Sequence, residues 1–124
     1  MDINWPTARI TEFDSTDELG LVIGRVGHDI LRLPVWVVTV DGAVYVRSYR
    51  GVTSVWFRRV QADADQAVTL AGRDIPVRFE NVDRLDHVNH AIDAAFAHKY
   101  ARFDYVTAMS EPAAVEATLR ILPR

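Results

Sequence analysis

The stretch VTVDGAVYVRSYRGVTSVWFRR, residues 38–59, follows the order strand, turn, strand, loop and helix. Asp41-Gly42 separates two runs of β-branched and aromatic residues, and this dipeptide is the strongest short-range signal of a tight β-hairpin. In the return strand, residues 43–48, valines alternate with Tyr45 and Arg47. Alternate side chains of a strand face opposite sides of the sheet. The stretch therefore predicts a hairpin whose second strand leads through a loop into a helix.

The loop after this hairpin ends the strand and begins the helix. Gly51 breaks the strand pattern, and Thr53 or Ser54 can cap a helix that runs to about residue 64. The N-terminus of a helix presents free N–H groups and the positive end of the helix dipole, and both favour an anion. The loop is therefore a candidate anion site.

The charge of this stretch is opposite to that of the whole chain. The 124 residues carry a formal net charge of −3, yet Arg47, Arg50, Arg58 and Arg59 gather around Trp56. Guanidinium groups pair with phosphate oxygens in a bidentate fork, and tryptophan offers a flat face to a ring system. The cluster predicts a ligand with an aromatic ring and a phosphate. The alternative is that the arginines are solvated and Trp56 belongs to the core.

The rest of the chain predicts one α+β domain over residues 1–124, in which about six short strands are linked mostly by hairpins. A small antiparallel barrel is the natural closure of such a sheet. The run at 31–40 is apolar on both faces at its centre, so this strand is expected to be central. The predicted helices are 7–17, 84–100 and a short one from about 111, and the other strands are 19–26, 67–71, 75–82 and 118–122.

Composition narrows the function classes. The negative net charge argues against general binding of nucleic acid or anionic membranes. The chain has no cysteine, which excludes disulfides and cysteine-based zinc sites. No apolar run reaches the roughly 20 residues of a membrane helix, and the N-terminus lacks the pattern of a signal peptide. We expect a cytoplasmic protein. His87 and His90 are interpreted as solvated, so no metal site is predicted.

Five segments, WVVTVDGAVYVRS, VWFRR, AGRDIPVRFENVD, AIDAAFAHKYARF and ATLRILPR, resemble the small bacterial domain-of-unknown-function family 2255. The resemblance covers residues 18–124. That family is similar to the split β-barrel proteins that bind flavin mononucleotide or the 8-hydroxy-5-deazaflavin cofactor. The resemblance implies a small antiparallel split β-barrel, a homodimer and one of these cofactors.

The resemblance also implies roles for individual residues. Val35 and Trp36 would border the cofactor ring, Arg47 and Ser48 would reach ring or ribityl oxygens, and Ser54, Arg58 and Arg59 would hold the phosphate. The cofactor-binding set implied by the loop and the start of the helix is Val35, Trp36, Arg47, Ser48, Arg50, Gly51, Ser54, Trp56, Arg58 and Arg59.

Tyrosines are the candidates for catalysis, because a phenol can donate a proton and stack on a ring. Tyr49 lies in the arginine-rich loop and Tyr105 in an unpatterned loop, whereas Tyr100 falls on the apolar face of a predicted helix and is expected in the core. The leading hypothesis is an oxidoreductase that uses the cofactor on a small organic substrate. The alternatives are a cofactor-independent isomerase or cyclase and a non-catalytic small-molecule binder.

Overall fold

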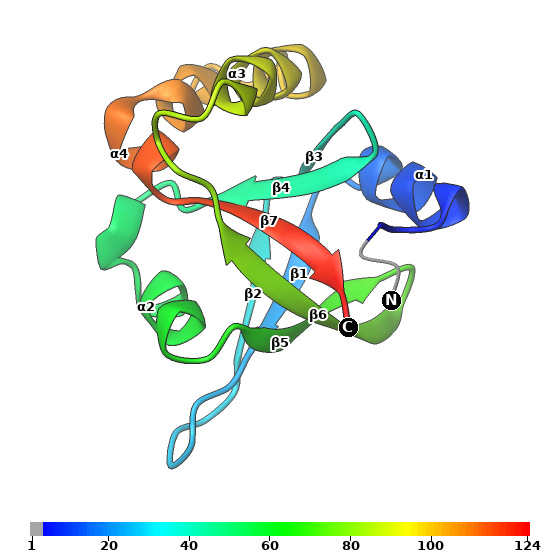
Figure 1. The fold of residues 1–124 in the computed structure, drawn as a ribbon, viewed down its shortest axis with the longest axis vertical. Coiled ribbons are helices and arrows are strands. Elements are labelled where there is room, and N and C mark those ends of the chain that lie inside the picture. Colours follow the sequence, from blue (N-terminus) through cyan, green and yellow to red (C-terminus); the bar gives the residue numbers. More distant parts are fainter. Residues whose placement is uncertain (1–3) are drawn as a thin grey trace.

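A single antiparallel sheet of seven strands dominates the computed structural model, which describes residues 4–124 (Figure 1). The described strands are β1 Leu19–Ile23, β2 Leu31–Val35, β3 Val38–Val40, β4 Ala43–Arg47, β5 Asp65–Leu70, β6 Arg73–Asn81 and β7 Thr118–Pro123. The described α-helices are α1 Thr7–Ser15, α2 Val55–Ala62, α3 Val88–Lys99 and α4 Pro112–Glu116, and two short 3₁₀ turns are η1 Gly51–Thr53 and η2 Val106–Ser110.

The order of the strands requires the sheet to curl. That order is β2-β1-β5-β6-β7-β4-β3, so β2 and β3 lie at opposite ends of the sheet. Only Trp36 and Val37 join them along the chain. Three Cα–Cα steps span at most about 11 Å, so the two ends of the sheet lie close together in space. The sheet is a curled half-barrel, which confirms the predicted α+β split barrel with seven strands where about six were expected.

The prediction of one central strand over residues 31–40 was wrong. The run breaks at Trp36-Val37, and its two halves form the two edges of the sheet. At the break, the main chain of Val37 bonds to side chains near the end of α3: its N–H donates to the Tyr100 hydroxyl (3.0 Å), and its C=O accepts from Lys99 Nζ (2.7 Å). The run is apolar on both faces because Val37 packs inside the barrel and Val38 packs under α3.

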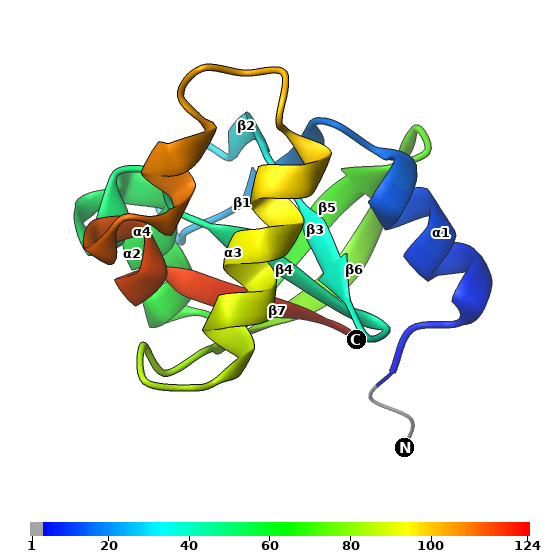
Figure 2. The ribbon, with the colours of Figure 1, turned by 90° about the horizontal axis from the view of Figure 1, so that it is seen from above.

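Two apolar clusters cover the two faces of the sheet. The inner cluster includes Val44 and Val46 of β4, whereas Tyr45 belongs to the outer cluster beneath α3. This arrangement confirms the alternation predicted for residues 43–48. Figure 2 shows α3 lying across the outer side of β3 and β4. The end of β4 and the segment after α3 are thereby brought to the same side of the barrel.

The long helix begins later than the sequence pattern indicates. It was predicted over 84–100, but α3 begins at Val88, and Leu85 is 77% exposed. The carboxylates of Asp83 and Asp86 accept hydrogen bonds from the N–H groups of Leu85 (2.8 Å) and Val88 (2.9 Å). Aspartate side chains stabilise turns in this way, so the local turn replaces the first turn of the helix.

Gly51 is required by both its backbone and its surroundings. Its φ is +76°, its N–H donates to Ser48 O (2.9 Å), and an added Cβ would lie 3.2 Å from Ala113 O. The left-handed conformation costs a residue with a side chain about 1–2 kcal/mol. The close contact packs η1 against α4, and this packing fixes the loop that follows β4.

We therefore expect Gly51→Ala to destabilise the protein by about 2–4 kcal/mol, from positive φ and overpacking together. Gly72→Ala is the matched control, because Gly72 also has a φ of +76° but no atom lies within 4 Å of its added Cβ. That control should lose only about 1–2 kcal/mol. Urea unfolding measures both, and equal losses would show that the contact with Ala113 is not restrictive.

Candidate functional site

A cavity of about 510 Å³ opens between edge strand β2 and the loop after β4. The residues that line it are Leu33, Pro34, Val35, Trp36, Arg47, Ser48, Tyr49, Arg50, Ser54, Trp56, Tyr105 and Met109. Most of these side chains are apolar or aromatic, and two are arginines. Among the residues that the structure describes, no acidic side chain lines the cavity. The charged side chains in the lining are therefore both cationic, in a protein of net charge −3.

Most of the predicted site residues meet in this cavity. Nine line it: Val35, Trp36, Arg47, Ser48, Tyr49, Arg50, Ser54, Trp56 and Tyr105. The other three, Gly51, Arg58 and Arg59, are not part of the lining. Gly51 acts on the shape of the loop through its contact with Ala113. The sequence reasoning missed Leu33, Pro34 and Met109. Leu33 and Pro34 directly precede Val35 in the predicted strand, so they could have been predicted as neighbours of the site. No local sequence pattern distinguishes Met109.

Hydrogen bonds between serines shape the loop. Ser48 Oγ donates to Ser54 Oγ (2.8 Å), which also accepts from the N–H of Phe57 (3.4 Å) as the cap of α2. Thr53 and Ser54 were the two candidates for the helix cap, and Ser54 is the residue that caps α2. The turn from Ser48 to Gly51 is closed by their main-chain hydrogen bond, and Arg50, with φ −85° and ψ 5°, has the geometry of the third residue of a type I turn.

The four arginines differ in what they bind. Arg58 donates to Thr53 O (3.0 and 3.2 Å), and Arg59 donates to Ile23 O (3.3 Å) and Asp29 O (2.9 Å). Arg47 is only 1% exposed and donates within the protein. Arg50 is exposed, and its guanidinium has no hydrogen-bond or ion-pair partner within residues 4–124. Of the arginines in this stretch, Arg50 is the one whose guanidinium is free at the cavity.

The N-terminus of α2 adds main-chain donors beside Ser54. The N–H groups of Val55 and Trp56 donate to no group of the described chain, whereas those of Phe57 and Arg58 bond to Ser54. Unpaired N–H groups in the first turn of a helix attract anions. These two N–H groups follow Ser54 in the chain, and Ser54 and Trp56 line the cavity together with Arg50.

Aromatic rings form the opposite wall. Trp36 stacks on Tyr100, with ring centroids 4.1 Å apart and planes 4° apart, and on Tyr105, at 5.3 Å and 21°. Tyr100 is fully buried, which confirms its predicted place in the core, and burial raises its pKa to about 12. Tyr105 is 60% exposed and Tyr49 is 63% exposed, so both phenols are accessible at the cavity.

Two further properties bear on the predicted partners. Within residues 4–124, no three His, Cys, Asp or Glu side chains come together as they would around a metal ion. No helix in the described part of the chain has the length and apolar character needed to cross a membrane.

Several solved structures share this fold. A FAD-binding protein from Mesorhizobium loti has a TM-score of 0.63 at 19% identity, with 98% of this chain and 91% of that chain covered. A putative 5-nitroimidazole antibiotic resistance protein from Bacteroides thetaiotaomicron has a TM-score of 0.64 at 15% identity (98% and 81%). A conserved hypothetical protein from Mycobacterium tuberculosis has a TM-score of 0.58 at 14% identity (99% and 82%).

These likenesses show that the chain shares the split β-barrel fold of these proteins, one of which is a FAD-binding protein. Residues 9–121 match the family described as "Uncharacterized protein conserved in bacteria (DUF2255)", and the chain belongs to this family. The resemblance noted in the sequence is thereby confirmed. No curated protein matches the sequence.

Proposed function

We propose that the protein binds a flavin-type cofactor, flavin mononucleotide or the 8-hydroxy-5-deazaflavin cofactor, and acts with it as an oxidoreductase on a small organic molecule. The observation that carries this proposal is the cavity itself, which has Trp36 and Trp56 in its walls and the free guanidinium of Arg50 in its lining. A flat ring with an anionic tail matches both features.

The residues present fit such a group. A volume of about 510 Å³ lies within the range of about 300–1,000 Å³ typical of small-molecule sites. Val35, Trp36 and Met109 offer apolar surface to the ring. Arg50, together with the N–H groups of Val55 and Trp56, would hold the phosphate, because charge-assisted hydrogen bonds and a helix N-terminus both favour it.

A flavin-type cofactor supplies the transfer of hydride or electrons. The chain's own residues would bind the ring, exclude water and handle a proton. Tyr105 and Tyr49 are the candidates for that proton, because each has an accessible phenol beside the cavity. The Tyr100 phenol is buried, donates to Asp17 O (2.7 Å) and has a raised pKa, so it is assigned to the core.

A fluorescence titration tests the proposal. The purified protein is titrated with flavin mononucleotide and, separately, with the deazaflavin cofactor. We expect saturable binding of one of them with a Kd in the micromolar range or below. If neither binds, the cofactor assignment fails, and a cofactor-independent isomerase or cyclase, or a simple binder, would have to be considered. Size-exclusion chromatography of the same sample tests the predicted homodimer.

Tyr105 gives a separate prediction about binding and chemistry. Tyr105→Phe keeps the ring that stacks on Trp36, so cofactor affinity should stay within about twofold of wild type. Tyr105→Ala removes a ring that lines the cavity. A contact between this ring and the cofactor ring would be worth about 0.5–1.5 kcal/mol, so affinity should fall roughly two- to tenfold. If Tyr105 donates a proton, turnover should fall in both variants, and full turnover in Tyr105→Phe would exclude that role.

A further inference from the structure

Among the residues that the structure describes, one hydrogen bond joins a wall of the cavity to the sheet. Residues 103–110 carry Tyr105 and Met109 into the cavity lining. The main-chain bonds of this segment are local, such as Val106 N to Phe103 O (3.2 Å) and Ala108 N to Tyr105 O (3.1 Å). Within residues 4–124, its one hydrogen bond to the sheet runs from Arg47 Nη1 to Met109 O (2.8 Å).

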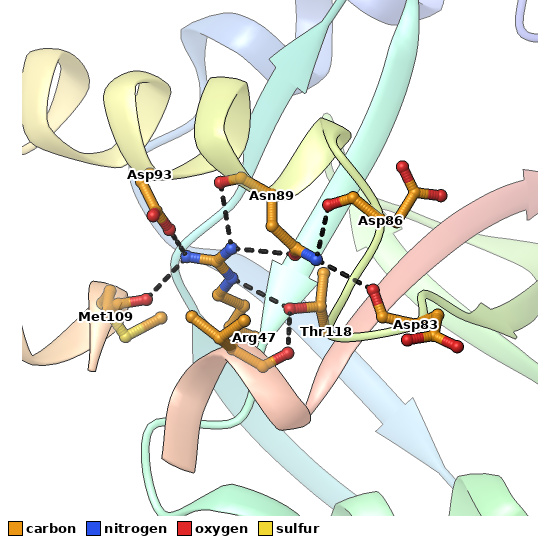
Figure 3. Close-up of polar contacts among 8 residues, drawn as sticks. Arg47, Asp83, Asp86, Asn89, Asp93, Met109 and Thr118 are labelled. Atoms are coloured by element: carbon orange, nitrogen blue, oxygen red, sulfur yellow. Dashed lines mark hydrogen bonds and ion pairs between the residues drawn. The ribbon is translucent and has the colours of Figure 1, made fainter. Parts of the chain in front are cut away.

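Arg47 has no donor left for a ligand. A guanidinium has five N–H groups. Nε donates to Thr118 Oγ1 (2.9 Å), Nη1 donates to Asp93 Oδ1 as well as to Met109 O, and Nη2 donates to Asn89 Oδ1 (3.1 Å) and Asn89 O (3.4 Å) (Figure 3). The role of reaching ring or ribityl oxygens, which the family resemblance implies for Arg47, requires donors that the protein already uses.

The partners of Arg47 belong to three separate elements, which its hydrogen bonds join. Asn89 and Asp93 lie on α3, Met109 on η2 and Thr118 on β7, while Arg47 itself ends β4. Asn89 extends the network, because its Nδ2 donates to Asp83 O (2.9 Å) and Asp86 O (3.1 Å), as Figure 3 shows. Arg47 therefore fixes the position of the Met109 wall relative to the Ser48–Gly51 turn on the other side.

We infer that Arg47 is a positioning residue, which sets the distance between the two walls of the cavity through Met109 O and does not touch the ligand. That Arg47 holds the Met109 wall follows from the geometry alone, whereas the effect of this wall on a flavin-type ligand rests on the proposed function. One measurement tests the wall without ligand, and a second tests its effect on ligand binding.

The first measurement uses the protein without ligand. Arg47→Lys keeps a cation for Asp93 but replaces the five-donor fork with three donors on one atom. Loss of the hydrogen bond from Arg47 to Met109 O should make local opening of this segment easier. The rate of hydrogen–deuterium exchange at the Val106 and Ala108 amides should therefore rise roughly tenfold or more, since a hydrogen bond from a charged group shifts an opening equilibrium by about that factor. Asp93→Asn is the matched control, since it removes the charge but leaves an oxygen acceptor for Arg47, and exchange should rise less than about threefold. Unchanged exchange in Arg47→Lys would overturn the inference.

The second measurement compares flavin mononucleotide with riboflavin, which has the same ring and no phosphate. A displaced wall should weaken the binding of both to Arg47→Lys by the same factor. A loss confined to flavin mononucleotide would mean that Arg47 contacts the phosphate and would overturn the inference. If neither compound binds the wild-type protein, flavin mononucleotide is ruled out as the cofactor of the proposed function, while the exchange experiment still decides the role of Arg47 in the wall.

A measurement on the wild-type protein covers the case in which Arg47→Lys does not fold. The Nε–H of Arg47 is buried and bonded to Thr118 Oγ1, so its NMR signal should be protected from exchange. Its chemical shift should stay nearly constant through a titration with flavin mononucleotide, whereas the Arg50 Nε–H signal should move. A large shift of the Arg47 signal together with that of Arg50 would show direct contact with the ligand and contradict the inference.

Discussion

Replacing Arg50 with alanine is expected to weaken the binding of flavin mononucleotide by about 10- to 100-fold. Hydrogen bonds between charged groups contribute about 1.5–3 kcal/mol, and 1.4 kcal/mol corresponds to a tenfold change in affinity. Arg50 lines the cavity, and its guanidinium has no partner within the described residues, so this group is available to the phosphate. The affinity for riboflavin should stay unchanged, because that ligand lacks the phosphate. Isothermal titration calorimetry measures both.

Arg58→Ala is the matched control for this experiment. Arg58 carries the same charge in the same stretch, but it donates to Thr53 O and is not part of the cavity lining. Its loss should change the affinity for flavin mononucleotide by less than about twofold. If Arg58→Ala weakens binding as much as Arg50→Ala does, the phosphate lies where the family resemblance implied, and the role proposed for Arg50 is wrong.

Tyr100→Phe is expected to destabilise the protein by about 1–3 kcal/mol. The Tyr100 hydroxyl accepts from Val37 N (3.0 Å) and donates to Asp17 O (2.7 Å), at the point where the chain crosses between the two edges of the sheet. The variant leaves the buried N–H of Val37 without this acceptor, which costs about that amount. Urea unfolding at pH 8 measures the loss. An unchanged free energy of unfolding would show that the crossing does not depend on this hydroxyl.

The same variant makes a prediction about pH. Burial raises the pKa of Tyr100 to about 12 in the folded protein, against about 10 in the unfolded chain. A raised pKa contributes stability that is fully present below pH 10 and is lost as the pH rises through 12. The difference in stability between wild type and Tyr100→Phe should therefore shrink by about 1 kcal/mol between pH 9 and pH 11. A constant difference would contradict the raised pKa.

The parts of the fold that depend on neighbouring residues were predictable from the sequence. The Asp41-Gly42 hairpin, the cap at Ser54 and the alternation of residues 43–48 all follow from local chemistry, and the structure has each of them. Most of the candidate site residues lie in or beside these features, and they line one cavity. A local sequence signal was enough here because the hairpin, the loop and the helix are consecutive.

The parts that depend on distant contacts were not predictable in this way. The break at Trp36-Val37 depends on Lys99 and Tyr100, more than 60 positions away. The commitment of Arg47 to Asn89, Asp93, Met109 and Thr118 likewise joins distant segments. An arginine that lines a ligand site and an arginine that holds a wall in place have the same sequence signature. Their hydrogen-bond partners distinguish them.

The most direct test of the central claim is a ¹H–¹⁵N NMR titration of the three tryptophan indole N–H groups with flavin mononucleotide. Trp36 and Trp56 line the cavity, whereas the Trp5 indole is not part of the lining and donates to Ile121 O (2.8 Å), so it serves as an internal control. Binding in the cavity should shift the signals of Trp36 and Trp56 together until they saturate, while the Trp5 signal stays constant. Saturable binding that leaves the Trp36 and Trp56 signals unchanged would place the ligand elsewhere and rule out this cavity as the cofactor site.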